Sequence, residues 1–403
     1  MENRIRKKIA GDEKIDVSKA HEFLDELEQK YFQKIRNYDF PTVELEESRP
    51  LDEVCQIFES LNKKGIKLGV FELLTARLYP HDINLRDLWK ATREESNIIK
   101  EFYGTENYDS DDTMLKIVTL LIQRNGSNPL SPKRKDVLNL THNNFKKHWD
   151  RAAKLLHKTL EILKAEYGVL SRTWLPYVTI VVPFSIILGI VENEVPGPKK
   201  IECNKKVARW YWCSVFSQRY DQAADTRAVK DITEMTAWFK DDKTVPEAVR
   251  NFREGGINLR SVTGGVVYSG VISLLIKNGA KDFHDGTKIS TQLVIDKNVD
   301  GHHIFPKKYL ESIKIKGDDV DCILNKTLIS ASTNRRIKDK SPKVYLEEIE
   351  KEVGRAGLYE ILKSHYTIDS GDAPIFEDKF KEFIEEREKL ILKAISIVVE
   401  SKE

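Results

Sequence analysis

The chain has 403 residues, enough for two or three domains, and the 40% that are hydrophobic can form a sizeable core. Its 66 lysines and arginines nearly balance its 64 aspartates and glutamates, which leaves a net charge of +2. This balance excludes a globally basic nucleic-acid coat protein. Any contact with nucleic acid must therefore come from local patches of charge.

Cysteine usage and hydropathy indicate a cytoplasmic protein. Cys55, Cys203, Cys213 and Cys322 form no Cys-x-x-Cys pair, and the N-terminus lacks the apolar core of a secretory signal. We therefore expect reduced thiols and no zinc knuckle. The uncharged segment 175–191 contains two prolines and is shorter than the roughly 20 residues of a spanning helix, so it predicts a buried pair of helices and no membrane partner.

The first two thirds of the chain predict a mainly α-helical protein. Apolar residues at helical spacing indicate an amphipathic helix over 16–36, and alternating apolar residues indicate a short strand over 37–45. Further helices are predicted over 48–62, 68–79, 85–103, 111–123, 141–167 and 205–220.

A group of aromatic residues in the last of these helices allows two interpretations. With Arg209 and Arg219 nearby, the rings could stack on a flipped or modified base. Their helical spacing instead favours packing in the core. The residues concerned are Trp210, Tyr211, Trp212, Phe216 and Tyr220.

The C-terminal third predicts a small module of strands and helices. We expect strands over 288–294, up to His303, and over 325–329, followed by a helix over 331–337. Two more helices are predicted over 343–353 and 373–400, and the apolar stripe of the last one indicates packing rather than DNA binding.

The most informative feature is the segment 299–306, which contains His302 and His303 and is followed by Asn325 and Asn334. Neutral imidazole is a common metal ligand, and its proton affinity suits a base at neutral pH. Because neighbouring side chains of a strand face opposite sides, one histidine can bind metal while the other activates water. An asparagine amide can accept the other N–H of the base, and a second polar ligand can complete the metal's protein shell. This set predicts hydrolysis of a phosphodiester.

The runs 302–306, 324–329 and 333–342 resemble an HNH (ββα-metal) nuclease, most closely the nuclease domain of GmrSD-type modification-dependent restriction endonucleases. The resemblance implies a mainly α protein with a C-terminal ββα-metal module. It implies that His302 binds the metal and that His303 is the general base. Asn325 would orient the base loop, and Asn334 would take the last ligand position, where many relatives have histidine.

The same resemblance extends to the cofactor and to further residues. Lys338 and Lys340 fall where it suggests phosphate or structural contacts. The metal would be divalent, with Mg²⁺ favoured by hard oxygen ligands and Mn²⁺ or Ni²⁺ as alternatives.

Residues 40–79 resemble the latter half of the other GmrSD domain, which has a ParB-like nucleotide-binding core. The Asp-Gly-Gln-Gln-Arg motif of that core is absent from the sequence, as is a Gly-x-x-x-x-Gly-Lys-Ser/Thr phosphate loop. We therefore expect no nucleotide-binding residues here; a separate DGQQR-type subunit could supply them. A plain helical connector is the alternative for this segment.

These observations give an expected organisation. Residues 1–80 would be a remnant of the GmrSD-type N-terminal domain, 81–280 a helical domain, and 281–403 the nuclease module with its C-terminal helices. The expected function is metal-dependent cleavage of DNA in restriction of foreign or modified phage DNA. The alternatives are a non-catalytic or partner-dependent DNA-binding subunit of a split restriction system, and an RNA-directed or toxin-like nuclease.

Four acidic residues near the histidines remain ambiguous in the sequence. Asp300 could support the metal from behind its ligands or cap a turn. Asp318, Asp319 and Asp321 could attract a cation, although a solvated loop is the favoured interpretation.

Overall fold

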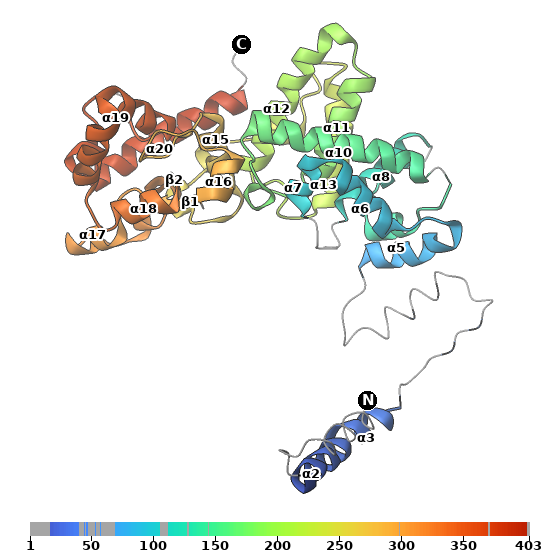
Figure 1. Ribbon diagram of the computed structural model, residues 1–403. Coiled ribbons are helices and arrows are strands. Elements are labelled where there is room, and N and C mark those ends of the chain that lie inside the picture. The colour runs from blue at the N-terminus through green and yellow to red at the C-terminus, as the bar shows by residue number, and fades with distance from the viewer. Residues whose placement is uncertain are drawn as a thin grey trace. The chain divides into compact units, whose positions relative to one another are not determined.

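The computed structural model describes residues 17–39, 44, 46, 53, 57, 69–104, 112–126, 129–143, 145–297, 299–369 and 371–400. The chain divides into two compact units, Met1–Ile66 and Lys67–Glu403 (Figure 1). The predicted helical and nuclease segments therefore belong mostly to the same compact unit.

The first unit contains the helix predicted over 16–36. It runs as α2 (Val17–Leu27), a π-helical turn η1 (Glu28–Phe32) and α3 (Gln33–Arg36). The strand predicted over 37–45 and the helix predicted over 48–62 lie almost entirely outside the described residues.

The first half of the second unit is helical, as predicted. One predicted helix, 85–103, is divided in two because Ser96 adopts an extended backbone and its side chain accepts a hydrogen bond from the N–H of Ile99, which begins a new helix. The helices are α5 (Val70–Leu78), α6 (Leu85–Glu95), α7 (Asn97–Tyr103), α8 (Thr113–Arg124), α9 (Arg134–Leu138), α10 (Phe145–Tyr167), α11 (Val181–Asn193), α12 (Lys200–Phe216), α13 (Ala224–Trp238), α14 (Glu247–Arg250) and α15 (Gly265–Lys277).

The uncharged segment 175–191 forms one buried helix rather than the predicted pair. Leu175 precedes a proline and is extended, with ψ of 123°, because the proline ring disfavours a helical conformation in the residue before it. The helix α11 therefore begins only at Val181, and Pro183 occupies its first turn, where a missing N–H is tolerated. Among the described helices, none combines the length and apolarity needed to cross a membrane.

The aromatic group predicted in the helix 205–220 packs in the core, although α12 ends at Phe216, before Tyr220. All five rings are buried, and those of Tyr211 and Trp212 contact Tyr167 of α10. Arg219 is held in a 2.6 Å ion pair with the fully buried Asp231, which also accepts a hydrogen bond from Trp210. The core interpretation is thus correct, and base stacking by these rings is excluded by their burial.

The second half of this unit carries the only β-sheet of the described residues, which is two-stranded. Strand β1 (Asp300–His303) pairs antiparallel with β2 (Lys326–Ile329), with His302 opposite Thr327. Figure 1 shows both strands grouped with the helices that surround them. These helices are α16 (Thr291–Lys297), α17 (Lys307–Ser312), α18 (Ala331–Ile337), α19 (Pro342–Ser364) and α20 (Phe380–Glu400).

Two predictions for this region need correction. The strand predicted over 288–294 is wrong, because Ser290 caps the helix α16 by accepting a hydrogen bond from the N–H of Leu293. The helix predicted over 343–353 continues to Ser364 as α19, with a break at Gly354, whose φ of 73° suits glycine. The helix predicted over 373–400 begins only at Phe380.

We predict that Gly301→Ala destabilises the fold and that Tyr268→Phe relieves much of the damage. A Cβ at Gly301 would lie 2.0 Å from the hydroxyl of Tyr268, whereas the next ring atom is 3.4 Å away, an ordinary contact. Overpacking of this kind costs about 1–3 kcal/mol. Chemical denaturation of both single variants and the double variant forms the test.

The matched control for this cycle is Gly255→Ala, where an added Cβ meets no atom within 4 Å. A double variant less stable than Gly301→Ala alone would contradict the steric explanation.

Candidate active site

The two histidines stand at the end of β1 and line one cleft of about 520 Å³. Both are half-buried. Consecutive residues of a strand face opposite sides, yet both histidines line this cleft. Asn334 of α18 lines the same cleft, so three of the four residues singled out by the sequence come together.

His303 is oriented by a carboxylate rather than by an asparagine. Its Nε2 lies 3.0 Å from Oδ1 of Asp321, and a carboxylate only accepts hydrogen bonds, so Nε2 carries the proton and Nδ1 keeps its lone pair. Burial lowers the pKa of His303, and this outweighs the opposing effect of Asp321. The ring is therefore a neutral base at neutral pH.

Asp321 is half-exposed, in line with the solvated-loop interpretation, but its side chain is also held in place. Nζ of Lys307 lies 2.7 Å from Asp321 Oδ1, and this hydrogen bond lowers the pKa of the carboxyl group. Lys307, Asp321 and His303 thus form a chain of contacts in which the carboxylate lies between the ammonium group and the imidazole.

Asn325 organises the backbone around the base and does not touch the ring of His303. It is fully buried. Its Oδ1 accepts from the N–H of Phe305 at 2.9 Å, and its Nδ2 donates to the carbonyls of Phe305 at 3.1 Å and Val320 at 2.9 Å. The side chain therefore ties the segment after β1 to the segment before β2.

Arg387 of α20 forms hydrogen bonds with the backbone of the segment that leads into β2. The fully buried guanidinium donates to the carbonyl oxygens of Leu324 and Lys326, each at 2.7 Å, and also to those of Ile323 and His365 at 3.2 Å. Burial lowers the pKa of Arg387 to about 9, so it remains charged at neutral pH. The sequence pattern of α20 predicted packing but not this contact.

Asp282 positions the helix that carries Asn334. Its Oδ2 accepts from the N–H of Ser330 at 2.6 Å, and its Oδ1 accepts from the hydroxyl of Thr333 at 2.5 Å. Both partners lie at the start of α18, so a buried carboxylate fixes the direction of this helix.

His302 and Asn334 have the side-chain chemistry of metal ligands, and both line the cleft. Burial lowers the pKa of His302, which leaves a neutral imidazole, and within the described chain neither side chain has a hydrogen-bond partner. One imidazole and one carboxamide oxygen would leave further coordination positions to water and phosphate. No cluster of three or more His, Cys, Asp or Glu side chains suited to a metal occurs among the described residues.

Asp300 is a residue of β1, where it pairs with Ile329, and it caps no turn. Its Oδ1 accepts a hydrogen bond from the N–H of the next residue, Gly301, at 2.7 Å, and the side chain is exposed. Its charge also acts on His302, where it opposes the lowering of the pKa by burial.

The predicted phosphate contacts separate into two kinds. Lys338 lines the cleft, whereas Lys340 forms a 2.6 Å ion pair with Glu348 and does not line it. Lys340 is thus a structural contact. Sequence reasoning missed three more cations of the cleft, Lys307, Lys308 and Arg335, although two of them directly follow the histidine motif.

His365 links β2 to the segment that precedes α16. It is fully buried, with Nδ1 2.5 Å from the hydroxyl of Thr327 and Nε2 2.6 Å from the carbonyl of Lys281. Burial lowers its pKa to about 4, helped by the charge of Arg387 and opposed by that of Asp282.

Comparison with known proteins gives a relative but no family. No protein-family model matches the chain. An uncharacterized protein of Methanocaldococcus jannaschii is 32% identical over 402 residues, a match that covers 91% of this chain and 65% of the relative. The chain thus spans less than two thirds of the length of this curated relative.

We predict that Asn325→Ala destabilises the protein strongly while Asn334→Ala does not. The first change leaves the N–H and carbonyl of Phe305 and the carbonyl of Val320 without a partner, at a cost of about 3 kcal/mol or more. Asn334 makes no described side-chain hydrogen bond, so its loss should cost less than about 0.5 kcal/mol. Denaturant unfolding measures both; equal effects would refute the assigned role of Asn325.

We also predict that His365 makes the fold sensitive to acid. Below pH 6.5 the unfolded chain binds a proton at this histidine, whereas the folded chain does so only near pH 4, so its contribution is present above pH 6.5 and lost as the pH falls towards 4. The loss amounts to about 3 kcal/mol. Unfolding free energies at several pH values should therefore fall less steeply for His365→Gln than for the natural chain; parallel slopes would contradict this.

Proposed function

We propose that this chain is a metal-dependent HNH endonuclease that hydrolyses DNA phosphodiester bonds in the restriction of foreign or modified phage DNA. The observation that carries the proposal is the convergence of His302, His303 and Asn334 on one cleft, from a hairpin followed by a helix. This order of elements supports the resemblance to a ββα-metal module over residues 281–403.

The chain's own residues divide the chemistry among them. His303 takes a proton from water at Nδ1, because Asp321 holds its other nitrogen. His302 and Asn334 would hold a divalent ion, Mg²⁺ first, with Mn²⁺ or Ni²⁺ as alternatives. Such an ion supplies stabilisation of the charge on the phosphate and on the leaving oxygen.

The charge of the cleft supports a nucleic-acid substrate. Four cationic side chains line it, against one carboxylate, that of Asp339. Asp339 is 3.4 Å from Nζ of Lys308, which leaves the cleft with a net positive lining although the whole chain is nearly neutral. Phosphodiester backbones bind to such local patches. The cationic residues are Lys307, Lys308, Arg335 and Lys338.

The remaining parts of the proposal concern organisation. Residues 81–280 would form a helical domain, and residues 1–80 a remnant of the GmrSD-type N-terminal domain. A separate nucleotide-binding subunit is a proposed partner, because the DGQQR motif is absent from this sequence.

We predict that His303→Ala lowers cleavage of duplex DNA in the presence of Mg²⁺ by about 10²–10⁴-fold, because the water loses its base. The affinity for DNA should stay unchanged, since the cations of the cleft remain. Lys340→Ala is the matched control: it lies outside the cleft, and its cleavage rate should equal that of the natural chain. Rates come from single-turnover cleavage, and affinities from fluorescence anisotropy.

Other outcomes separate the alternatives. Cutting that survives His303→Ala would contradict the role of this base. Binding without cutting in Mg²⁺, Mn²⁺ and Ni²⁺ would indicate a DNA-binding subunit that needs a partner. Cleavage of RNA but not of DNA would indicate an RNA-directed nuclease.

A further inference from the structure

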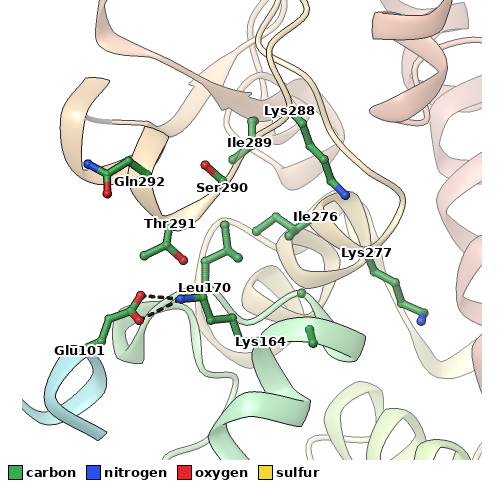
Figure 2. A pocket seen from close by; sticks show the side chains of 12 residues that line it. Glu101, Lys164, Leu170, Ile276, Lys277, Lys288, Ile289, Ser290, Thr291 and Gln292 are labelled. Carbon is green, nitrogen blue, oxygen red and sulfur yellow. Dashed lines mark hydrogen bonds and ion pairs between the residues drawn. The ribbon is translucent and has the colours of Figure 1, made fainter. Parts of the chain in front are cut away.

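A second pocket, of about 700 Å³, shares none of the residues that line the histidine cleft. Figure 2 shows its side chains, which come from α7, α10, the segment 168–170 that follows α10, α15 and the segment 288–292 at the start of α16. The pocket thus lies between the helical part of the second unit and the segment that leads into β1.

The lining of this pocket combines an apolar wall with an excess of positive charge. Leu170, Ile276 and Ile289 form part of the wall. Three lysines accompany a single carboxylate, that of Glu101, which is bound by Lys164 at 2.8 Å. The two other lysines, Lys277 and Lys288, both lie on the side away from Glu101 in Figure 2.

These two lysines have no carboxylate partner within the described part of the chain. Nζ of Lys277 donates one hydrogen bond to the backbone carbonyl of Glu166 at 2.9 Å, which directs its ammonium group and leaves two N–H groups. Lys288 is exposed and no interaction of its side chain with a described residue is found. Two unneutralised ammonium groups beside a low-dielectric wall attract anions.

The chain between the pocket and the histidine cleft limits how far apart the two can lie. From Thr291 at the pocket to His303, the chain runs through α16 and β1 and can span at most about 30 Å. One turn of duplex DNA is about 34 Å long. A duplex held at His303 can therefore extend to this distance.

We propose that this pocket is a second contact site for the DNA substrate, where Lys277 and Lys288 bind phosphate groups away from the bond that is cut. The inference rests on the proposed function, because DNA is the assigned substrate. The contact uses the phosphate backbone alone, so it contributes affinity and orientation without reading sequence.

The test measures binding of a 30-base-pair duplex to the full chain with His303→Ala, over a series of salt concentrations. Each phosphate contact contributes about 0.9 to the slope of log K against log salt. We expect Lys288→Ala to reduce the slope by about 0.9 and Lys277→Ala with Lys288→Ala to reduce it by about 1.8. Glu101→Gln should have the opposite effect, because it removes the one carboxylate and releases Lys164.

The matched control removes the same number of charges elsewhere. Lys381→Ala with Lys393→Ala, on exposed positions of α20 that do not line the pocket, should leave the slope unchanged. Melting temperatures confirm that each variant is folded. A pocket double variant with the slope of the control, or a weaker complex with Glu101→Gln, would overturn the proposal.

This experiment separates the second contact from the nuclease activity. If the unmodified chain cuts DNA but the pocket variants bind with an unchanged slope, only the second contact fails. If the chain never cuts but the slopes change as expected, the pocket binds phosphate and only the proposed hydrolysis fails.

Discussion

The candidate site depends on one carboxamide. Asn325 satisfies two backbone groups of Phe305 and one of Val320 inside the core, where an unpaired polar group would cost several kcal/mol. This joins the backbone that follows His303 to the loop that carries Asp321. Because the imidazole and the carboxylate sit on segments tied by the same side chain, the 3.0 Å contact between them is set by the core rather than by solvent-exposed groups.

A buried arginine stabilises this arrangement in an unusual way. Arg387 has no carboxylate partner among the described residues; its guanidinium donates to three backbone carbonyls around the start of β2 and to that of His365, while its Nε makes no described hydrogen bond. The desolvation of this charge is expensive, and only carbonyl dipoles compensate for it. Removing the side chain would leave those carbonyls unpaired in an apolar interior. The helix α20 therefore stabilises the backbone that leads into β2.

The sequence predicted the local elements of the site well and their partners poorly. The helix over 331–337 has a local signal in its capping Ser330. The strand ending at His303 has the sequence Asp-Gly-His-His and could be predicted only from the histidine motif that it carries. The strand over 288–294 failed because the same apolar residues also suit a short helix, and a capping serine decided between them. Asp321, Asp282 and Arg387 act through contacts 18 to 64 residues away in sequence, which no local pattern records.

The distribution of charge links the site to the rest of the chain. A net charge of +2 would give weak attraction for DNA if the charges were evenly spread. Instead, carboxylates neutralise some lysines, as Glu348 does for Lys340. Other lysines have no carboxylate partner among the described residues, such as Lys338 in the histidine cleft and Lys288 in the second pocket. Beside the cleft, the carboxylate of Asp321 orients His303, and Lys307 partly offsets its charge. Local pairing, rather than total charge, thus determines where an anion can bind and where a neutral base is available beside it.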